Sequence, residues 1–142
     1  MVDNNRLRDK LQSIQTNLAE LKKVEQLSLE EFVNSVIQFH ATTRMLQISI
    51  EAILDIAQHV VARKHLGTPK TYREAIELLA KAGILSADQL PTLLNMVRFR
   101  NRVVHQYDDV SRAEVYRIAT ERLADFEHFI AAIVRYNWGS NR

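Results

Sequence analysis

The stretch FHATTRMLQISIEAILDIAQHVV, residues 39–61, decides the fold of this chain. Its apolar side chains recur at intervals of three and four residues, the spacing that places them on one face of an α-helix. The same spacing extends outward and predicts one long helix over residues 28–66. One apolar row contains Phe32, Val36, Phe39, Thr43, Leu46, Ile50, Ile53, Ala57 and Val60, and a second contains Ile37, Ala41, Met45, Ile48, Ala52 and Ile56. This helix therefore hides most of its circumference and should be the central one.

The composition favours long helices joined by few turns. Only 3 Gly and 2 Pro occur among 142 residues, and 46% of the residues are hydrophobic, enough to bury one sizeable core. We therefore expect a single all-α domain over residues 1–142. The chain has no cysteine, which excludes disulfides and thiolate zinc sites and fits a reducing cytoplasm. The polar N-terminus predicts neither a signal peptide nor a membrane span, so a cytoplasmic protein is expected.

The charged residues nearly balance. The chain carries 19 Lys and Arg against 17 Asp and Glu, a formal net charge of +2. A dedicated phosphate-binding protein usually has a strong basic excess. Any RNA-binding site must therefore be a local cluster.

Capping boxes, in which a Ser or Thr precedes a Glu or Gln by three residues, mark the predicted helix starts. They are Ser28/Glu31, Thr71/Glu74, Ser86/Gln89 and Ser111/Glu114. Gly67 and Gly83 supply the matching helix stops. Together with the apolar spacing, these signals predict helices over about 4–26, 28–66, 72–82, 87–105 and 112–137. Short connections between them imply an up-and-down bundle of four long helices plus a short one.

The segment RFRNRVVHQY, residues 98–107, brings a dense group of charges into the fourth predicted helix. With Arg100 at zero and about 100° per residue, the apolar stripe of this helix runs from roughly 20° to 120°. Asn101, His105 and Tyr107 fall at roughly 100°, 140° and 340°, and are expected to continue that stripe. The residues expected to lie outside it are Phe99 and Arg102, and Arg102 is expected to face solvent or RNA backbone.

Burying Arg100 and Asn101 is costly unless they are paired. Three explanations stay open at this point: a structural salt bridge, a contact with another subunit, or a cleft open to an anionic ligand. His105 near the helix end is also compatible with a favourable interaction with the helix dipole.

Arginine and histidine together suit metal-free cleavage of RNA. The 2′-OH attacks the adjacent phosphorus, a base takes its proton, an acid protonates the leaving 5′-oxygen, and a cation stabilises the charged transition state. This reaction needs both an acid and a base, and the segment supplies only one histidine per chain. A symmetric dimer would bring two copies together near its axis.

No metal or cofactor site is predicted. The remaining histidines, His40, His59, His65 and His128, form no pair with metal-ligand spacing, and no Gly-rich phosphate loop occurs.

The segment around Arg100 resembles the R-x4-H-x-Y signature of HEPN ribonuclease toxins of the HepT type. Arg100, Asn101, His105 and Tyr107 match the signature, and Gln106 stands where many members have glycine. The resemblance covers most of the chain, because further segments follow the order and spacing of that family. They are SLEEF at 28–32, EAILDIAQHVV at 51–61, TPKTYREAIELLAKAGIL at 68–85 and MVRFRNRVVHQY at 96–107.

The resemblance implies a homodimeric HEPN bundle in which both motifs face one composite cleft. It implies a metal-independent endoribonuclease, acting on tRNA or mRNA as the toxin of a type II toxin–antitoxin pair. Arg100 would stabilise the scissile phosphate, His105 would act as acid or base, and Asn101 would orient the phosphate or the histidine. Tyr107 would receive AMP from ATP, transferred by an MntA-type nucleotidyltransferase antitoxin. The alternative is a non-catalytic helical module that binds a nucleotidyltransferase and presents a substrate to it.

Overall fold

The computed structural model describes residues 4–139, and all regular structure in this part of the chain is helical. The α-helices are α1 (Asn4–Leu21), α2 (Leu29–Val33), α3 (Val36–Arg63), α4 (Tyr72–Lys81), α5 (Gln89–His105), α6 (Arg112–Glu121) and α7 (Leu123–Val134). Two 3-10 turns, η1 (Lys22–Gln26) and η2 (Tyr107–Asp109), and a π-helical turn, η3 (Arg135–Gly139), complete the structure. The predicted all-α class is confirmed.

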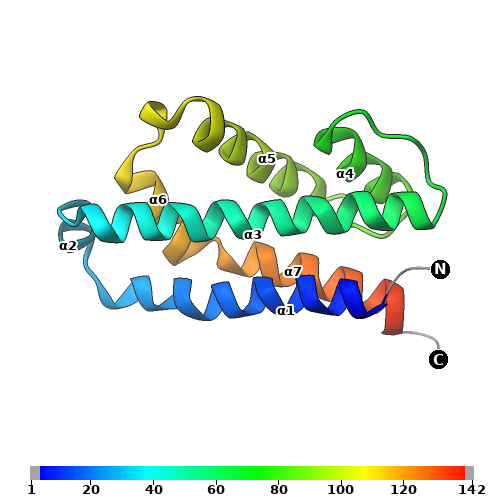
Figure 1. Ribbon diagram of the computed structural model, residues 1–142, viewed down its shortest axis with the longest axis horizontal. Coiled ribbons are helices and arrows are strands. Elements are labelled where there is room, and N and C mark those ends of the chain that lie inside the picture. Colours follow the sequence, from blue (N-terminus) through cyan, green and yellow to red (C-terminus); the bar gives the residue numbers. More distant parts are fainter. Residues whose placement is uncertain (1–3, 140–142) are drawn as a thin grey trace.

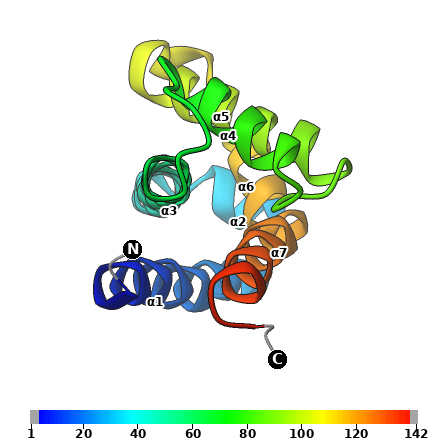
Figure 2. The same ribbon diagram turned by 90° about the vertical axis from the view of Figure 1, so that its right-hand side faces the viewer.

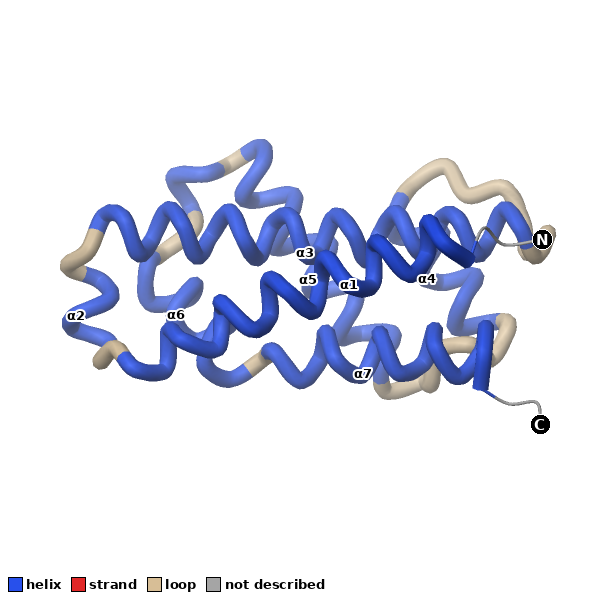
Figure 3. Tube along the Cα trace, turned by 60° about the horizontal axis from the view of Figure 1, so that its bottom comes forward, coloured by secondary structure: helices blue, strands red, loops and turns tan. Residues whose placement is uncertain are grey.

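The helices form an elongated bundle around α3, which runs along its full length (Figure 1). In that view α1 and α7 lie on one side of α3, and α4 and α5 lie on the other. Seen end-on, the long helices occupy the corners of a four-sided bundle (Figure 2). Most connections are short, and the longest described loops are residues 64–71 and 82–88 (Figure 3). The start of α1 and the end of η3 meet at the same end of the bundle.

One apolar core runs through the bundle from Leu7 to Ile133. The first apolar row of α3 lies in it, except for Val36, which is exposed. The second row is buried only toward the end of the helix, at Ile56, whereas Ile37 near its start is 79% exposed. By length and mean hydropathy (1.3) α3 also qualifies as a membrane span, but half of that window is buried inside the bundle. The apolar character of α3 is therefore that of a core helix.

The helix predicted over 28–66 is interrupted at Asn34 and Ser35. Ser35 has an extended backbone (φ −110°, ψ 109°), and its hydroxyl accepts a hydrogen bond from the Gln38 N–H. It is therefore the N-cap of α3, while Ser28 caps the separate helix α2 through a complete capping box. The expected single helix is wrong because a second cap lies inside the apolar run.

The end of α3 also differs from the prediction. His65, not Gly67, takes the left-handed conformation, with φ of 55°. The N–H of Leu66 then donates to the Val61 carbonyl at 3.0 Å, which closes a Schellman motif. Gly83 behaves as predicted: its φ is 80°, and it ends α4 through the same motif.

The helix predicted over 112–137 is divided at Arg122, whose backbone (φ −121°, ψ 6°) departs from helical geometry. As a result α6 packs against α2 and α3, and α7 lies beside α1. Lys22 Nζ lies 3.0 Å from Glu127 Oε2 and links η1 to α7 across this contact. The division at Arg122 therefore lets one chain segment close two sides of the bundle.

Candidate functional site

Helix α5 carries the candidate site, and its buried face is wider than the apolar spacing predicted. The buried side chains are Leu93, Leu94, Met96, Val97, Phe99 and Val103. On the same projection they span from about 260° through zero to about 120°, because α5 packs on both α3 and α7. Phe99, expected outside the stripe, is therefore buried. Asn101 and His105, expected inside it, lie at its edge and are exposed.

Arg100 lies at the centre of this buried arc, and its side chain is only 19% exposed. Its Nε donates to Glu51 Oε2 of α3 at 3.2 Å, and its Nη1 donates to Asn101 Oδ1 at 3.2 Å. The guanidinium carbon lies 5.4 Å from the centre of the Tyr72 ring at the start of α4. Nη2 has no hydrogen-bond partner among the described residues. Arg100 is thus held by contacts on three helices, while one terminal nitrogen of its guanidinium stays unpaired within the described part of the chain.

Glu51 is the residue that fixes Arg100. Its Oε2 also accepts a hydrogen bond from Gln47 Nε2 at 3.2 Å, one turn earlier on α3. The motif did not indicate Glu51, but a signal existed, since this carboxylate interrupts the apolar run of the central helix. A partly buried carboxylate there requires a cationic partner.

Asn101 lines an open cavity of about 540 Å³ between α3, α4 and α5. Lys70, Arg73 and Arg98 also line this cavity, and Arg73 pairs with Glu77 at 3.1 Å, so the cavity beside Arg100 is rich in cations. An amide and several cations around a solvent-accessible hollow suit the binding of phosphate oxygens. Of the three explanations open for Arg100, the structure shows the ion pair with Glu51, and the cavity lies beside Arg100, lined by its neighbours Tyr72 and Asn101.

His105 is the last residue of α5 and is exposed, with no hydrogen-bond partner among the described residues. Gln106 ends the helix (φ −140°, ψ 52°), and Tyr107 begins η2. The side chain of Tyr107 lies outside the described part of the structure. Five residues of helix turn His105 by about 140° from Arg100, so the two side chains leave α5 in different directions.

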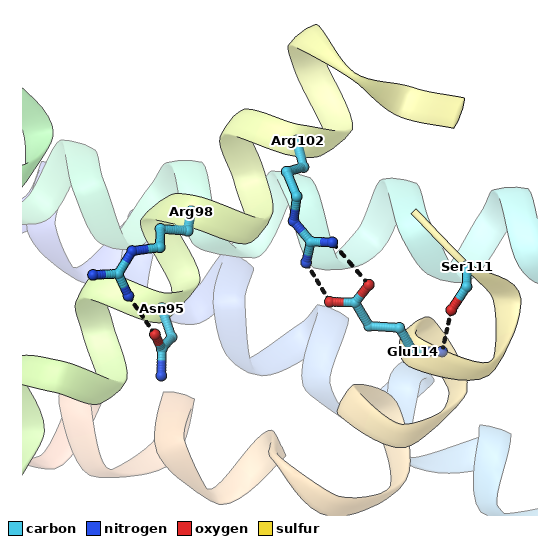
Figure 4. A network of polar contacts seen from close by, with 5 residues as sticks. All are labelled: Asn95, Arg98, Arg102, Ser111 and Glu114. Atoms are coloured by element: carbon cyan, nitrogen blue, oxygen red, sulfur yellow. Dashed lines mark hydrogen bonds and ion pairs between the residues drawn. The ribbon is translucent and has the colours of Figure 1, made fainter. Parts of the chain in front are cut away.

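Arg102 does not face solvent alone, in contrast to the prediction. Its two terminal nitrogens bind both oxygens of Glu114 on α6, one of them at 3.0 Å (Figure 4). The hydrogen bond with Glu114 raises the pKa of Arg102 above its usual value, against the opposing effect of burial. Glu114 was expected to close the Ser111 capping box, but only the Ser111 half of that box forms. The carboxylate is used instead to join α5 to α6.

Exposed apolar side chains occur on both α3 and α5. Ile37 near the start of α3 is 79% exposed, Val104 near the end of α5 is 42% exposed, and Ala41, one turn after Ile37, is exposed as well. Among the described residues no group of three or more His, Cys, Asp or Glu side chains is arranged to hold a metal ion.

The chain is similar to known ribonucleases of the HepT type. The model of the Ribonuclease HepT-like family matches residues 14–133. The tRNA nuclease HepT of Aphanizomenon flos-aquae is 31% identical over 127 residues, which cover 89% of this chain and 86% of that protein. The mRNA nuclease HepT of Shewanella oneidensis is 35% identical over 88 residues, which cover 62% of this chain and 66% of that protein.

Solved structures agree with this grouping. The tri-AMPylated HEPN toxin of Shewanella oneidensis, in complex with the MNT antitoxin, aligns with a TM-score of 0.83 at 28% identity, over 89% of this chain and 95% of that one. A toxin–antitoxin structure with AMP-PNP gives 0.82 at 27% identity, over 89% and 96%. The cytosolic protein YutE of Bacillus subtilis gives 0.83 at 20% identity, over 99% and 96%, which shows the fold alone.

Fold and site together define a helical domain of the HEPN type, with an incompletely paired arginine and an exposed histidine on one helix. The chain belongs to the Ribonuclease HepT-like family.

Proposed function

We propose that this protein is a metal-independent endoribonuclease, the toxin of a type II toxin–antitoxin pair, acting on RNA in the cytoplasm. The observation that carries the proposal is the state of Arg100, which is anchored by Glu51 and Asn101 while its Nη2 is left for an anion. The curated relatives are a tRNA nuclease and an mRNA nuclease, which supports RNA as the substrate class.

In the proposed reaction Arg100 binds the scissile phosphate and stabilises the charge that develops on it. A basic His105 removes the 2′-OH proton, the O2′–P bond forms, and the P–O5′ bond breaks. A second, protonated His105 gives its proton to the leaving 5′-oxygen. The products carry a 2′,3′-cyclic phosphate and a 5′-OH. Asn101, bonded to Nη1 of Arg100, keeps the guanidinium oriented toward the substrate.

The need for two histidines supports a homodimeric site. One protomer supplies one His105, which points away from its own Arg100 by about 140°. Val104, directly before His105, and Ile37, near the start of α3, are exposed apolar side chains that suit contact with a second copy. In the proposed dimer both motifs face one cleft, and Arg100 and His105 from the two chains complete it.

Tyr107 is the proposed regulatory residue. Its hydroxyl oxygen attacks the α-phosphorus of ATP, pyrophosphate leaves, and AMP remains attached. The catalyst is a nucleotidyltransferase antitoxin, by analogy with the relative that is AMPylated in complex with the MNT antitoxin. The added AMP phosphate lies two residues after His105 and competes with RNA for the cationic side chains of the site.

The decisive experiment compares the purified chain with its His105→Ala variant on tRNA and mRNA in the presence of EDTA. We expect the unsubstituted chain to cut RNA and to leave 5′-OH ends, and the variant to be inactive. A 2′-deoxy nucleotide at the cut position should abolish cleavage there. Equal behaviour of two folded proteins would favour the alternative, a non-catalytic partner of a nucleotidyltransferase.

Mixed dimers test the composite site. Unsubstituted subunits and subunits carrying His105→Ala are mixed in varying ratios, unfolded and refolded together. Because a dimer with one His105 lacks either the base or the acid, activity should fall with the square of the fraction of unsubstituted subunits, whereas a linear fall would contradict the shared site. Ile37→Asp serves as the companion variant, since it should shift the mass in solution from dimer to monomer and abolish cleavage.

A further inference from the structure

A second basic cavity lies on the other side of α5 from Asn101, where α5 meets α6 and α7. It has a volume of about 390 Å³ and is separate from the hollow beside Arg100, since only Arg98 lines both. Its charged lining is formed by Arg98, Arg102, Arg117, Arg122, Glu114 and Asp125. Four arginines thus face two carboxylates, and we call this cavity the α5–α6–α7 groove.

The partners of these charges decide what the groove can bind. Arg102 and Glu114 neutralise each other through two hydrogen bonds. Arg98 donates to the neutral carbonyl of Asn95 at 2.5 Å, as Figure 4 shows, and forms no ion pair among the described residues. Arg117 and Arg122 are exposed and likewise form no ion pair there. With Asp125 counted, the groove keeps an excess of about two positive charges.

The Arg102–Glu114 ion pair holds together the two helices that carry Arg98 and Arg117. It ties α5 to α6, and the helices on which Arg98 and Arg117 lie cannot separate without breaking it. Arginine forks held at a fixed spacing are matched to phosphate oxygens, and they bind without a large ordering cost. Free arginines around a preformed hollow therefore indicate an anionic ligand with several phosphates.

The groove also lies in line with His105. On α5, Arg98, Arg102 and His105 follow one another at intervals of four and three residues, within about 60° of one another around the helix. Arg98 and His105 are about 10 Å apart along the axis, a span of a few stacked nucleotides. A strand whose scissile phosphate lies at the His105 end of α5 can continue into the groove.

We propose that the α5–α6–α7 groove binds backbone phosphates of the RNA substrate that flank the cut, through Arg98, Arg117 and Arg122. This inference rests on the proposed ribonuclease function and adds a substrate-binding site outside the R-x4-H-x-Y motif. Because the groove holds phosphates and does not reach the scissile bond, it contributes to affinity and not to the chemical step.

The test uses the full chain with Arg117→Gln and Arg122→Gln combined, and Arg135→Gln as the matched control. Arg135 is also an exposed arginine, but it begins η3 directly after α7, about 20 Å along the helix axis from Arg122. Binding of a labelled single-stranded RNA is measured by anisotropy over a salt series, with His105→Ala added to every protein to prevent cleavage. Cleavage is measured without that change.

We expect the double variant to bind RNA about tenfold more weakly and to lose about 1.4 from the slope of log K against log salt, about 0.7 for each phosphate contact. Its kcat at saturating RNA should stay unchanged while KM rises about tenfold. Arg98→Gln alone should show about half of the change in slope. The control should match the unsubstituted chain in every measurement.

Failure of the groove assignment and failure of the proposed ribonuclease function give different results. If the unsubstituted chain cuts and binds RNA and the double variant equals the Arg135→Gln control, the groove is not an RNA site, whereas the proposed function stands. If the unsubstituted chain does not cut RNA, the proposed function itself fails. If the double variant keeps its RNA affinity but no longer binds the nucleotidyltransferase, the groove binds an acidic protein surface and the RNA assignment is overturned.

Discussion

Arg100 and Arg102 lie two residues apart on α5, and each pairs with a glutamate, yet the two pairs leave different groups free. Arg102 uses both terminal nitrogens on Glu114. Arg100 uses Nε on Glu51 and Nη1 on Asn101, and keeps Nη2. An ion pair alone therefore does not separate a structural arginine from one proposed to bind substrate. Among the described residues the two differ in which guanidinium nitrogen is left unpaired, the terminal Nη2 in Arg100 and the inner Nε in Arg102.

The largest expected effect follows from removing the partly free guanidinium. Arg100→Gln should lower the rate of RNA cleavage by about 10²–10³-fold, the usual cost of losing one donor to a developing charge. Arg100→Lys should recover only a small part of this rate, since it keeps the charge but not the fork. The measurement is kcat on a labelled RNA, with the thermal midpoint as control for folding. Activity within twofold of the unsubstituted chain would contradict the role of Arg100.

A smaller effect is expected when Arg100 is kept and its anchor is weakened. Glu51→Gln preserves the shape of the side chain but removes its charge, so the hydrogen bond from Nε becomes a weaker, neutral one. We expect kcat to fall about tenfold, while KM changes little because the other cations still bind RNA. A loss of stability without any change in kcat would show that Glu51 serves the fold only.

The Arg102–Glu114 pair should respond in the opposite manner, with a loss of stability and little loss of kcat. Arg102→Gln leaves a partly buried carboxylate without its cation and should lower the free energy of unfolding by about 1–2 kcal/mol. This expected loss is small for a partly buried ion pair, because the Arg102 side chain is 35% exposed and solvent screens the pair. Urea unfolding measures the change.

The double variant Arg102→Gln/Glu114→Gln is the matched control for that measurement. It removes the unpaired carboxylate as well, so it should be more stable than Arg102→Gln alone. If instead the two losses simply add, the two side chains do not interact and the bidentate pair is not what joins α5 to α6.

The difference between the two arginines was only partly predictable from the sequence. The motif indicated Arg100, Asn101 and His105, and the apolar spacing placed them on the correct helix. The projection treated α5 as a helix with one buried side, and it therefore misplaced Phe99. Glu51, the partner of Arg100, lies on α3 and is 49 residues away in the sequence. A local sequence pattern does not predict a contact between residues so far apart.

The helix boundaries show the same limit. The division before α3 was readable, because Ser35 precedes Gln38 by three residues and so repeats the capping pattern used elsewhere. The division at Arg122 carries no Gly, Pro or capping residue, and it exists because the chain must turn from the α2–α3 side of the bundle to the α1 side. Tertiary packing, which no local signal encodes, sets it.

The smallest expected effect concerns Ser111, which presents Glu114 to Arg102. Its hydroxyl accepts the Glu114 N–H at 3.0 Å, so it fixes the first turn of α6 on which that carboxylate lies. Ser111→Ala should lower the free energy of unfolding by about 1 kcal/mol, and Ser111→Gly by only a few tenths, since glycine is tolerated at an N-cap. Urea unfolding of both variants measures this, and kcat should stay unchanged in both, because Arg100 does not depend on α6. A marked loss of kcat in Ser111→Ala would mean that the two arginines are coupled through α5, and the separation between a structural and a substrate-binding arginine would have to be abandoned.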